Sequence, residues 1–212
     1  NLGKFINKEC HISLLETYLS ESSSGKSCPV LTDTAKRKYY AICVGNNTFD
    51  LRDYFPPLRN CHNDAKACEK MFTGNKFDTT LLLDVTLDVL KMEISKLAMK
   101  VQPGDNVAIT ISSHGVEHDS CNFIACKDST DPSTLFNVQR DVRDELDRKK
   151  LNILAIFLDA CRTPLTRSAG PSIYSLFSSS GGVRTRGIRD GAVMSTKSQY
   201  LIGFPCSSRV AA

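Results

Sequence analysis

Residues 151–162, LNILAIFLDACR, form an apolar run that ends in an acid, a thiol and a guanidinium. The unbroken apolar residues of 153–158 are typical of a strand that is buried on both faces of a parallel sheet. In open α/β sheets, ligands bind beyond the carboxyl ends of the strands. The stretch therefore predicts a central strand that delivers Asp159, Cys161 and Arg162 to a functional site.

The rest of the chain alternates strand-like runs with helical patterns. Helices are predicted over 58–72, after the capping residue Thr86, and over the polar stretch 137–150. Alternation of this kind implies right-handed crossovers and an α/β domain with a mainly parallel sheet. Besides the opening stretch, strands are predicted at 39–45, 79–85, 105–115, 121–126 and 199–206.

Length and composition limit the class of protein. The 212 residues suit one domain, or one domain with a tail, and the 41% of hydrophobic residues suffice for a core. The net charge of +4 is small and the basic residues are scattered, so a nucleic-acid partner is not expected. No apolar run reaches about 18 residues, so no membrane partner is expected either. Because the chain begins without Met and without a signal-like region, we interpret it as a trimmed or processed piece.

The nine cysteines form no CxxC pair and no regular framework, and several lie inside apolar runs. This distribution favours reduced, buried thiols and a cytoplasmic protein. A zinc cluster of Cys121, Cys126 and His118 is an alternative, although its spacing matches no standard zinc finger. A redox or metal-binding cysteine protein is thus a competing interpretation.

Two of the predicted strands end in reactive side chains, His114 and Cys161. Neighbouring parallel strands lie about 5 Å apart, so their ends can bring an imidazole close to a thiol. A thiol needs a base, or a lowered pKa, to act as a nucleophile near neutral pH, and His114 could be that base. The N–H groups of Gly115 and Cys161 could stabilise an oxyanion. Taken singly, either side chain is more often structural, so the pair alone leaves both roles open.

Several motifs together resemble those of the caspase-fold cysteine peptidases, in particular the metacaspase and paracaspase branches. SSHG at 112–115 and LDACR at 158–162 resemble the His-Gly and Asp-x-Cys motifs of the family. YYAICVGNN at 39–47 resembles its first strand, and PLRNCHNDAKACEKMF at 57–72 resembles the start of its first helix. QYLIGFPCSSRVAA from residue 199 resembles the strand that follows the catalytic loop.

The resemblance spans residues 38–210 and implies a particular architecture. A caspase-like three-layer sandwich is expected, with a mainly parallel central sheet and helices on both faces. The peptidase domain would occupy 38–212, after a polar N-terminal segment over 1–37. One more strand and two helices would follow Ala212, and dimerisation through the sheet edge that their absence exposes is a further expectation.

The resemblance also implies roles for individual residues. Cys161 becomes the nucleophile, His114 the base and general acid, and Gly115 the neighbouring backbone donor; no cofactor is needed. The acidic S1 pocket of the family falls on Asp64 and Asp159, and its neighbouring positions fall on Cys61 and Ser112. Two carboxylates in a partly dry pocket suit Arg or Lys at P1, so protein or peptide substrates with a basic P1 residue are expected.

Each pocket acid also has a structural interpretation. Asp159 could cap a turn at the end of its strand, and Asp64 could interact with a helix dipole. A catalytically silent homologue that acts as a scaffold or regulator is the rival to the peptidase, although it would have no chemical reason to keep both dyad residues and both acids.

Calcium-dependent metacaspases use a cluster of aspartates after the catalytic His and after the Cys. The matching region of this chain offers Asp128, Asp131 and Asp144, but Arg143 stands where a second acid is expected and Ser168 stands beyond the Cys. A hard divalent cation needs several oxygen ligands together. The site is therefore predicted to be eroded, and no metal is assigned.

The stretch 162–191 is rich in Ser, Gly, Pro and Arg and is predicted to be a mobile loop. Arg162 directly after Cys161 is more similar to paracaspases than to metacaspases. A peptidase that accepts Arg could cut this loop, although an ordinary solvated loop is the alternative. The candidate autoprocessing residues are Arg167, Arg184, Arg186 and Arg189.

Overall fold

A computed structural model describes residues 37–118, 121–161 and 199–203 of the chain. The polar N-terminal segment lies almost wholly outside the described residues. The Arg-rich loop after Cys161, with Ser168 and all four candidate processing sites, also lies outside them.

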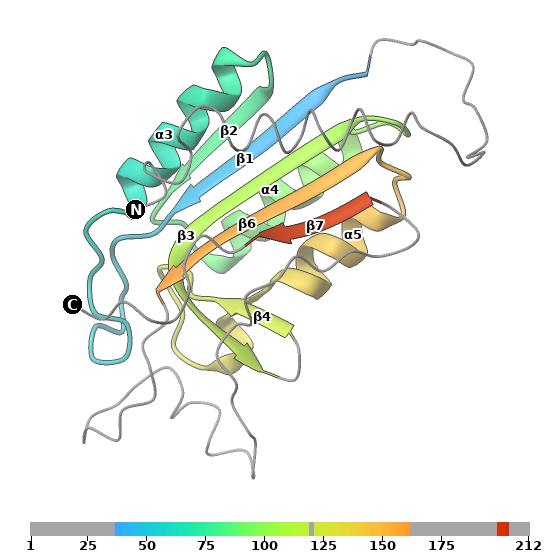
Figure 1. The fold of residues 1–212 in the computed structure, drawn as a ribbon. Coiled ribbons are helices and arrows are strands. Elements are labelled where there is room, and N and C mark those ends of the chain that lie inside the picture. Colours follow the sequence, from blue (N-terminus) through green and yellow to red (C-terminus); the bar gives the residue numbers. More distant parts are fainter. Residues whose placement is uncertain (1–36, 119–120, 162–198, 204–212) are drawn as a thin grey trace.

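The centre of the fold is a parallel sheet with the strand order β2-β1-β3-β6-β7 (Figure 1). Beyond His114, the long strand β3 leaves this sheet and pairs antiparallel with β4, which in turn pairs with β5. The mainly parallel α/β sheet predicted from the sequence is thereby confirmed. The strands are β1 (Tyr39–Gly45), β2 (Asp78–Leu83), β3 (Asn106–His118), β4 (Cys121–Ile124), β5 (Phe136–Asn137), β6 (Ile153–Cys161) and β7 (Gln199–Gly203).

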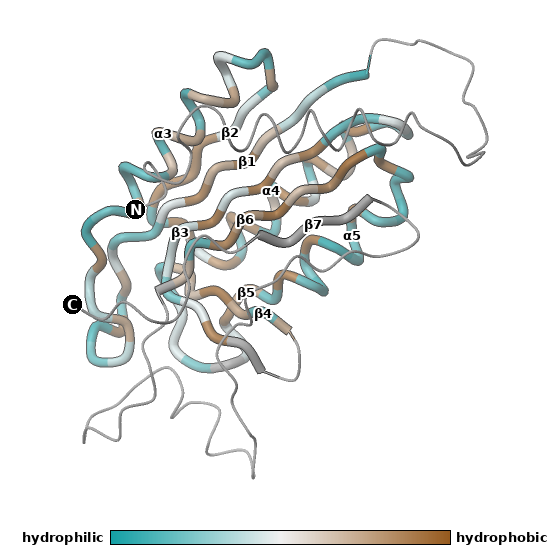
Figure 2. Tube along the Cα trace, viewed as in Figure 1, coloured by the Kyte–Doolittle hydropathy of each residue, from teal (hydrophilic) through white to brown (hydrophobic). Residues whose placement is uncertain are grey.

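Helices cover both faces of the sheet, which confirms the three-layer arrangement. Helix α3 (Cys61–Gly74) packs its buried Ala65, Cys68 and Phe72 on one face, against β1 and β3. Helix α4 (Leu87–Lys100) packs on the other face, together with α5 (Asp144–Asp147). Hydrophobic residues accordingly concentrate in the strands and on the inner sides of the helices (Figure 2).

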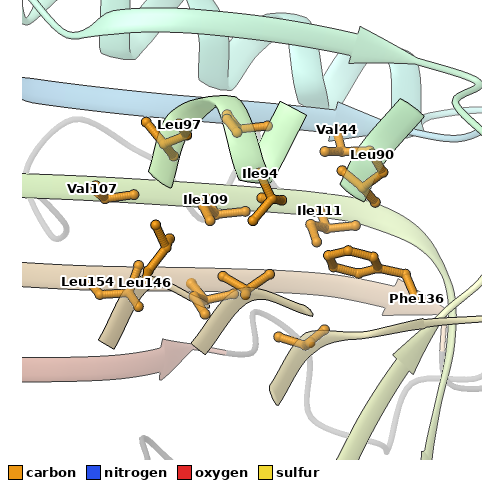
Figure 3. Close-up of a cluster of buried hydrophobic side chains, with 14 of the residues drawn as sticks. Val44, Leu90, Ile94, Leu97, Val107, Ile109, Ile111, Phe136, Leu146 and Leu154 are labelled. Atoms are coloured by element: carbon orange, nitrogen blue, oxygen red, sulfur yellow. The ribbon is translucent and has the colours of Figure 1, made fainter. Parts of the chain in front are cut away.

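The larger core lies between the sheet and α4 (Figure 3). Successive side chains of a strand point to opposite faces, so every second residue of β3 enters this core. Val107, Ile109 and Ile111 meet Leu90 and Ile94 of α4 there. The intervening residues of β3 face α3, and this alternation decides which face carries the site.

The start of α4 agrees with its predicted cap. Thr86 Oγ1 accepts a hydrogen bond from Val89 N at 3.4 Å, and Asp128 Oδ1 accepts one from Leu87 N at 2.9 Å. The helix predicted over 137–150 is wrong in extent, because this stretch is divided among β5, a π-helical turn over Gln139–Arg143 and the short α5. Asn137 instead donates its backbone N–H to Asp141 Oδ2 at 3.0 Å, which holds the first residues out of a regular helix.

Candidate active site

The register of β3 against β6 brings the two candidate catalytic residues to adjacent positions. His114 is paired with Cys161, and Ser112 is paired with Asp159. Paired residues of neighbouring strands lie about 4.8 Å apart across the sheet. Both pairs stand at the carboxyl ends of the parallel strands, which is where sites of open α/β sheets form.

His114 is held in one orientation by a backbone carbonyl. Its side chain is buried, and its Nε2 lies 2.7 Å from the carbonyl oxygen of Pro56. A carbonyl oxygen can only accept a hydrogen bond, so Nε2 is the protonated nitrogen. In the neutral imidazole, Nδ1 is then the nitrogen with the free lone pair, which is the arrangement that a general base requires.

The surroundings of His114 favour its neutral form. The rings of Phe49 and Phe55 lie with their centroids 5.0 and 6.0 Å from the imidazole. Burial lowers the pKa of His114 below its usual 6.5, and the hydrogen bond to the Pro56 carbonyl offsets part of this effect. The imidazole is therefore able to accept a proton at neutral pH.

Phe49, Phe55 and Pro56 all belong to the loop between β1 and α3, and none of them was predicted from the sequence to belong to the site. The loop and the end of the sheet share a small core, in which Phe49 and Phe55 pack with Val116, Ala125 and Leu135. The local signals were the apolar FPPL run at 55–58 and the isolated apolar side chains of Phe49 and Leu51 among polar residues of the loop. A backbone carbonyl carries no residue-type signature, so its role required the structure.

The candidate pocket acids lie on the α3 face of the sheet. A Cβ on Gly45 would lie 2.3 Å from the carbonyl oxygen of Cys61, so this glycine lets the first turn of α3 rest directly on the end of β1. That contact brings Asp64, which is 8% exposed, to the carboxyl edge of the sheet. Ser112 and its paired residue Asp159 share the face that Ala108 presents to α3.

The two carboxyl groups interact with each other electrostatically. The pKa of Asp64 is raised by burial and then by the charge of Asp159. Burial likewise raises the pKa of Asp159. The ionised form of each carboxyl group is destabilised by burial, and a nearby cation would stabilise it. The pair is therefore suited to binding a guanidinium or an ammonium group.

Cys61 and Ser112 are both buried beside these acids, Cys61 as the first residue of α3 and Ser112 within β3. Gly115 has a packing reason to be glycine. A Cβ there would lie 2.7 Å from the Cβ of Ala160 and 3.1 Å from Cδ1 of Ile124. The space beside Gly115 is thus filled by protein, and the part of its N–H in catalysis stays a prediction.

The acids of the candidate calcium cluster have individual structural partners. Asp128 receives the N–H of Leu87 as described above, Asp131 Oδ1 accepts from Ser133 N at 2.7 Å, and Asp144 pairs with Arg143. Across residues 37–118, 121–161 and 199–203, no three His, Cys, Asp or Glu side chains are grouped to hold a metal ion. The same ranges include Cys121 and the buried Cys126 as free thiols.

Comparison with known proteins defines the class. The family model of the caspase domain matches residues 38–207, so the chain belongs to the caspase-domain family of cysteine peptidases. No curated protein matches significantly. Among solved structures, protein GSU0716 from Geobacter sulfurreducens is 22% identical with a TM-score of 0.46, and the match covers 58% of this chain and 50% of that one. None of the helices in the described residues is long and apolar enough to cross a membrane.

Proposed function

We propose that this protein is a cysteine endopeptidase that cleaves peptide bonds after Arg or Lys through a dyad of Cys161 and His114. The observation that carries the proposal is the pairing of His114 with Cys161, combined with the Pro56 carbonyl that leaves Nδ1 of His114 as the basic nitrogen. Family membership supports the reaction type, since the caspase domain belongs to cysteine peptidases.

The proposed reaction has two covalent steps. Nδ1 of His114 takes the thiol proton, and the thiolate of Cys161 attacks the carbonyl carbon of the scissile bond. The N–H groups of Cys161 and Gly115 stabilise the resulting oxyanion, and the imidazolium returns the proton to the leaving amine as the C–N bond breaks. Water then hydrolyses the thioester, with His114 again as the base, and the free thiol is regenerated.

Asp64 and Asp159 select the P1 residue in this proposal, with Ser112 and Cys61 lining the same pocket. Their raised pKa values and mutual repulsion support the assignment, because a P1 guanidinium relieves both effects. An acidic P1 side chain would add a third negative charge and is therefore rejected. Arg162 after the nucleophile favours the paracaspase-like branch over the metacaspases.

Three further properties belong to the same proposal. A basic P1 preference makes the loop residues Arg167, Arg184, Arg186 and Arg189 candidates for autoprocessing. Strand β7 pairs with β6, and among the described residues it has no neighbour on its other side, which supports dimerisation through that edge. The cysteine usage supports a cytoplasmic location.

Fluorogenic peptides with Arg, Lys or Asp at P1 test the proposal. We expect cleavage after Arg and Lys, complete loss in Cys161→Ala, and retention in Cys121→Ala, which removes a half-buried thiol of β4. Electrophoresis of the same samples should show fragments of the chain in wild type and an intact chain in Cys161→Ala. Cleavage after Asp would overturn the pocket assignment, and a folded protein that cleaves none of the peptides would support the silent scaffold.

Calcium should have little effect on this activity. The aspartates of the candidate cluster are engaged in helix capping, a turn and an ion pair, and Arg143 brings a positive charge among them. We therefore expect kcat/KM for an Arg peptide to change less than about twofold between excess chelator and millimolar calcium, since a site without clustered oxygen ligands binds a hard cation weakly. Activity that disappears on chelation and returns with calcium would contradict this prediction.

A further inference from the structure

Asp84, directly after β2, has an unusual backbone conformation and accepts two backbone hydrogen bonds. Its φ is +49°, which lies in the left-handed region that most residues avoid. Its Oδ1 accepts hydrogen bonds from Asn47 N at 2.7 Å and Thr48 N at 3.0 Å, and His62 Nε2 lies 2.9 Å away. Its own N–H donates to the carbonyl oxygen of Gly45 at 3.0 Å. The carboxylate of Asp84 thus contacts both the residues that follow β1 and the first turn of α3.

These contacts continue to the catalytic histidine. The carbonyl oxygen of Asn47, whose N–H is bound by Asp84, accepts a hydrogen bond from Leu58 N at 2.9 Å. Leu58 follows Pro56 by two residues, and the Pro56 carbonyl is the group that binds Nε2 of His114. The two ends of the loop over 46–60 are therefore joined at Asn47, and Asp84 anchors that junction to β2.

The anchor is charge-assisted. Burial of Asp84 opposes ionisation, but His62 and the backbone donors outweigh it, so its pKa is lowered below the usual range. Hydrogen bonds to an ionised acceptor are roughly twice as strong as neutral ones. The loop is also held by neutral contacts: the buried Phe49 and Phe55 pack in the small core described above, Asn46 donates to Ala125 O and accepts from Val85 N, and Asp50 N–H donates to Lys127 O. Asp84 thus supplies the charged contact at the loop's base.

We propose that Asp84 is a positioning residue for catalysis: through Asn47 and Leu58 it holds the Pro56 carbonyl on Nε2 of His114 and so keeps Nδ1 as the basic nitrogen. Among the described side chains, Asp84 forms no hydrogen bond with His114, Asp64 or Asp159, so it acts on the histidine through the loop. The inference concerns the histidine itself, and its consequence for turnover rests on the proposed peptidase function.

Glycine is the sharpest substitution at this position. Asp84→Gly removes the carboxylate and still accepts a positive φ, so backbone strain is not a second cause. Asp84→Asn also tolerates this conformation and keeps one acceptor oxygen but not the charge, so an intermediate effect is expected. The matched controls are Asp78→Gly and Asp78→Asn, because Asp78 begins the same strand and forms an exposed ion pair with Lys100.

Two measurements separate the outcomes. The ring ¹⁵N chemical shifts of His114, recorded in the full chain with Cys161→Ala, report the tautomer without any need for activity. We expect one Nε2–H tautomer with either Asp78 control and a mixture of both tautomers with Asp84→Gly. In the active background, kcat of Asp84→Gly should fall about 10- to 100-fold with KM within about twofold, because the base is misplaced while the pocket acids are untouched.

The tautomer decides the proposal. A single Nε2–H tautomer in a folded Asp84→Gly or Asp84→Asn variant would overturn it, whatever the kinetics show. A shifted tautomer in a protein that cleaves no peptide in its wild-type form would retain the positioning role and overturn the peptidase function instead.

Discussion

His114→Gln should lower kcat/KM for an Arg peptide by about 10³-fold, within the range that general acid–base catalysis contributes. Gln can still donate a hydrogen bond to the Pro56 carbonyl, but it offers no group that accepts the thiol proton at neutral pH. The buried pocket between Phe49 and Phe55 remains filled, so the loss should appear with a nearly unchanged melting temperature. A variant that retains a tenth or more of the activity would show that another group activates Cys161.

The pH dependence of the wild-type protein supplies a second test of the same residue. Burial lowers the pKa of His114, so the imidazole takes up a proton at a lower pH than an ordinary histidine does. For a peptide with a neutral P1 residue, whose KM does not depend on the pocket acids, the acidic limb of the kcat/KM profile should consequently lie below the pH range of an ordinary histidine, and it should be absent in His114→Gln. An acidic limb above pH 6.5 would contradict the environment described for His114.

The second large effect is expected at Asp64 and Asp159, the acids of the proposed S1 pocket. Asp64→Asn and Asp159→Asn should each lower kcat/KM for Arg peptides about 100-fold, because removing one partner of a buried charge pair costs several kcal/mol. A peptide with a neutral P1 residue should lose much less, since it makes no ion pair with either acid. If Arg and neutral peptides lose equally, the acids support the fold rather than select the substrate.

Asp64→Asn and Asp159→Asn should raise the stability of the folded protein although they lower its activity. Folding raises the pKa of both carboxyl groups. Their contribution to the free energy of unfolding is therefore greatest at a pH below the pKa values of the unfolded chain, and it is lost as the pH rises through the pKa values of the folded protein. At neutral pH each charge therefore costs stability, and the Asn variants should melt at a higher temperature than wild type. Asp88→Asn is the control, because Asp88 occupies the first turn of α4 but is exposed, and there the loss of a helix-dipole interaction should lower stability slightly.

The same pKa shifts set the pH dependence of substrate binding. As the pH falls, Asp64 and Asp159 take up protons at a higher pH than ordinary carboxyl groups would. KM for Arg peptides should thus rise on mild acidification, while KM for neutral peptides stays flat. Parallel changes in both KM values would show that the effect does not come from the pocket acids.

Strand β6 could be identified directly from the sequence, because a strand buried on both faces of a parallel sheet reads as a near-continuous apolar run. The run over 153–158 became the centre of β6, and the capping residue Thr86 began α4 as predicted. The polar stretch 137–150 did not become one helix, because the Asn137 and Asp141 side chains bind backbone groups that a helix would use. The spacing of apolar residues does not reveal where a polar side chain will bind the backbone in place of the helical hydrogen bonds.

The sequence by itself determined the family and the α/β class, and it proposed the dyad and pocket residues, because each of these depends on residue type and order along the chain. Only the tertiary structure decided that His114 is paired with Cys161, since strand register depends on how the sheet packs as a whole. It alone also showed the Pro56 carbonyl and its anchor through Asp84. Every residue carries the same backbone carbonyl, and 37 residues separate Asn47 from Asp84, so nothing along the chain distinguishes these groups until folding brings them together.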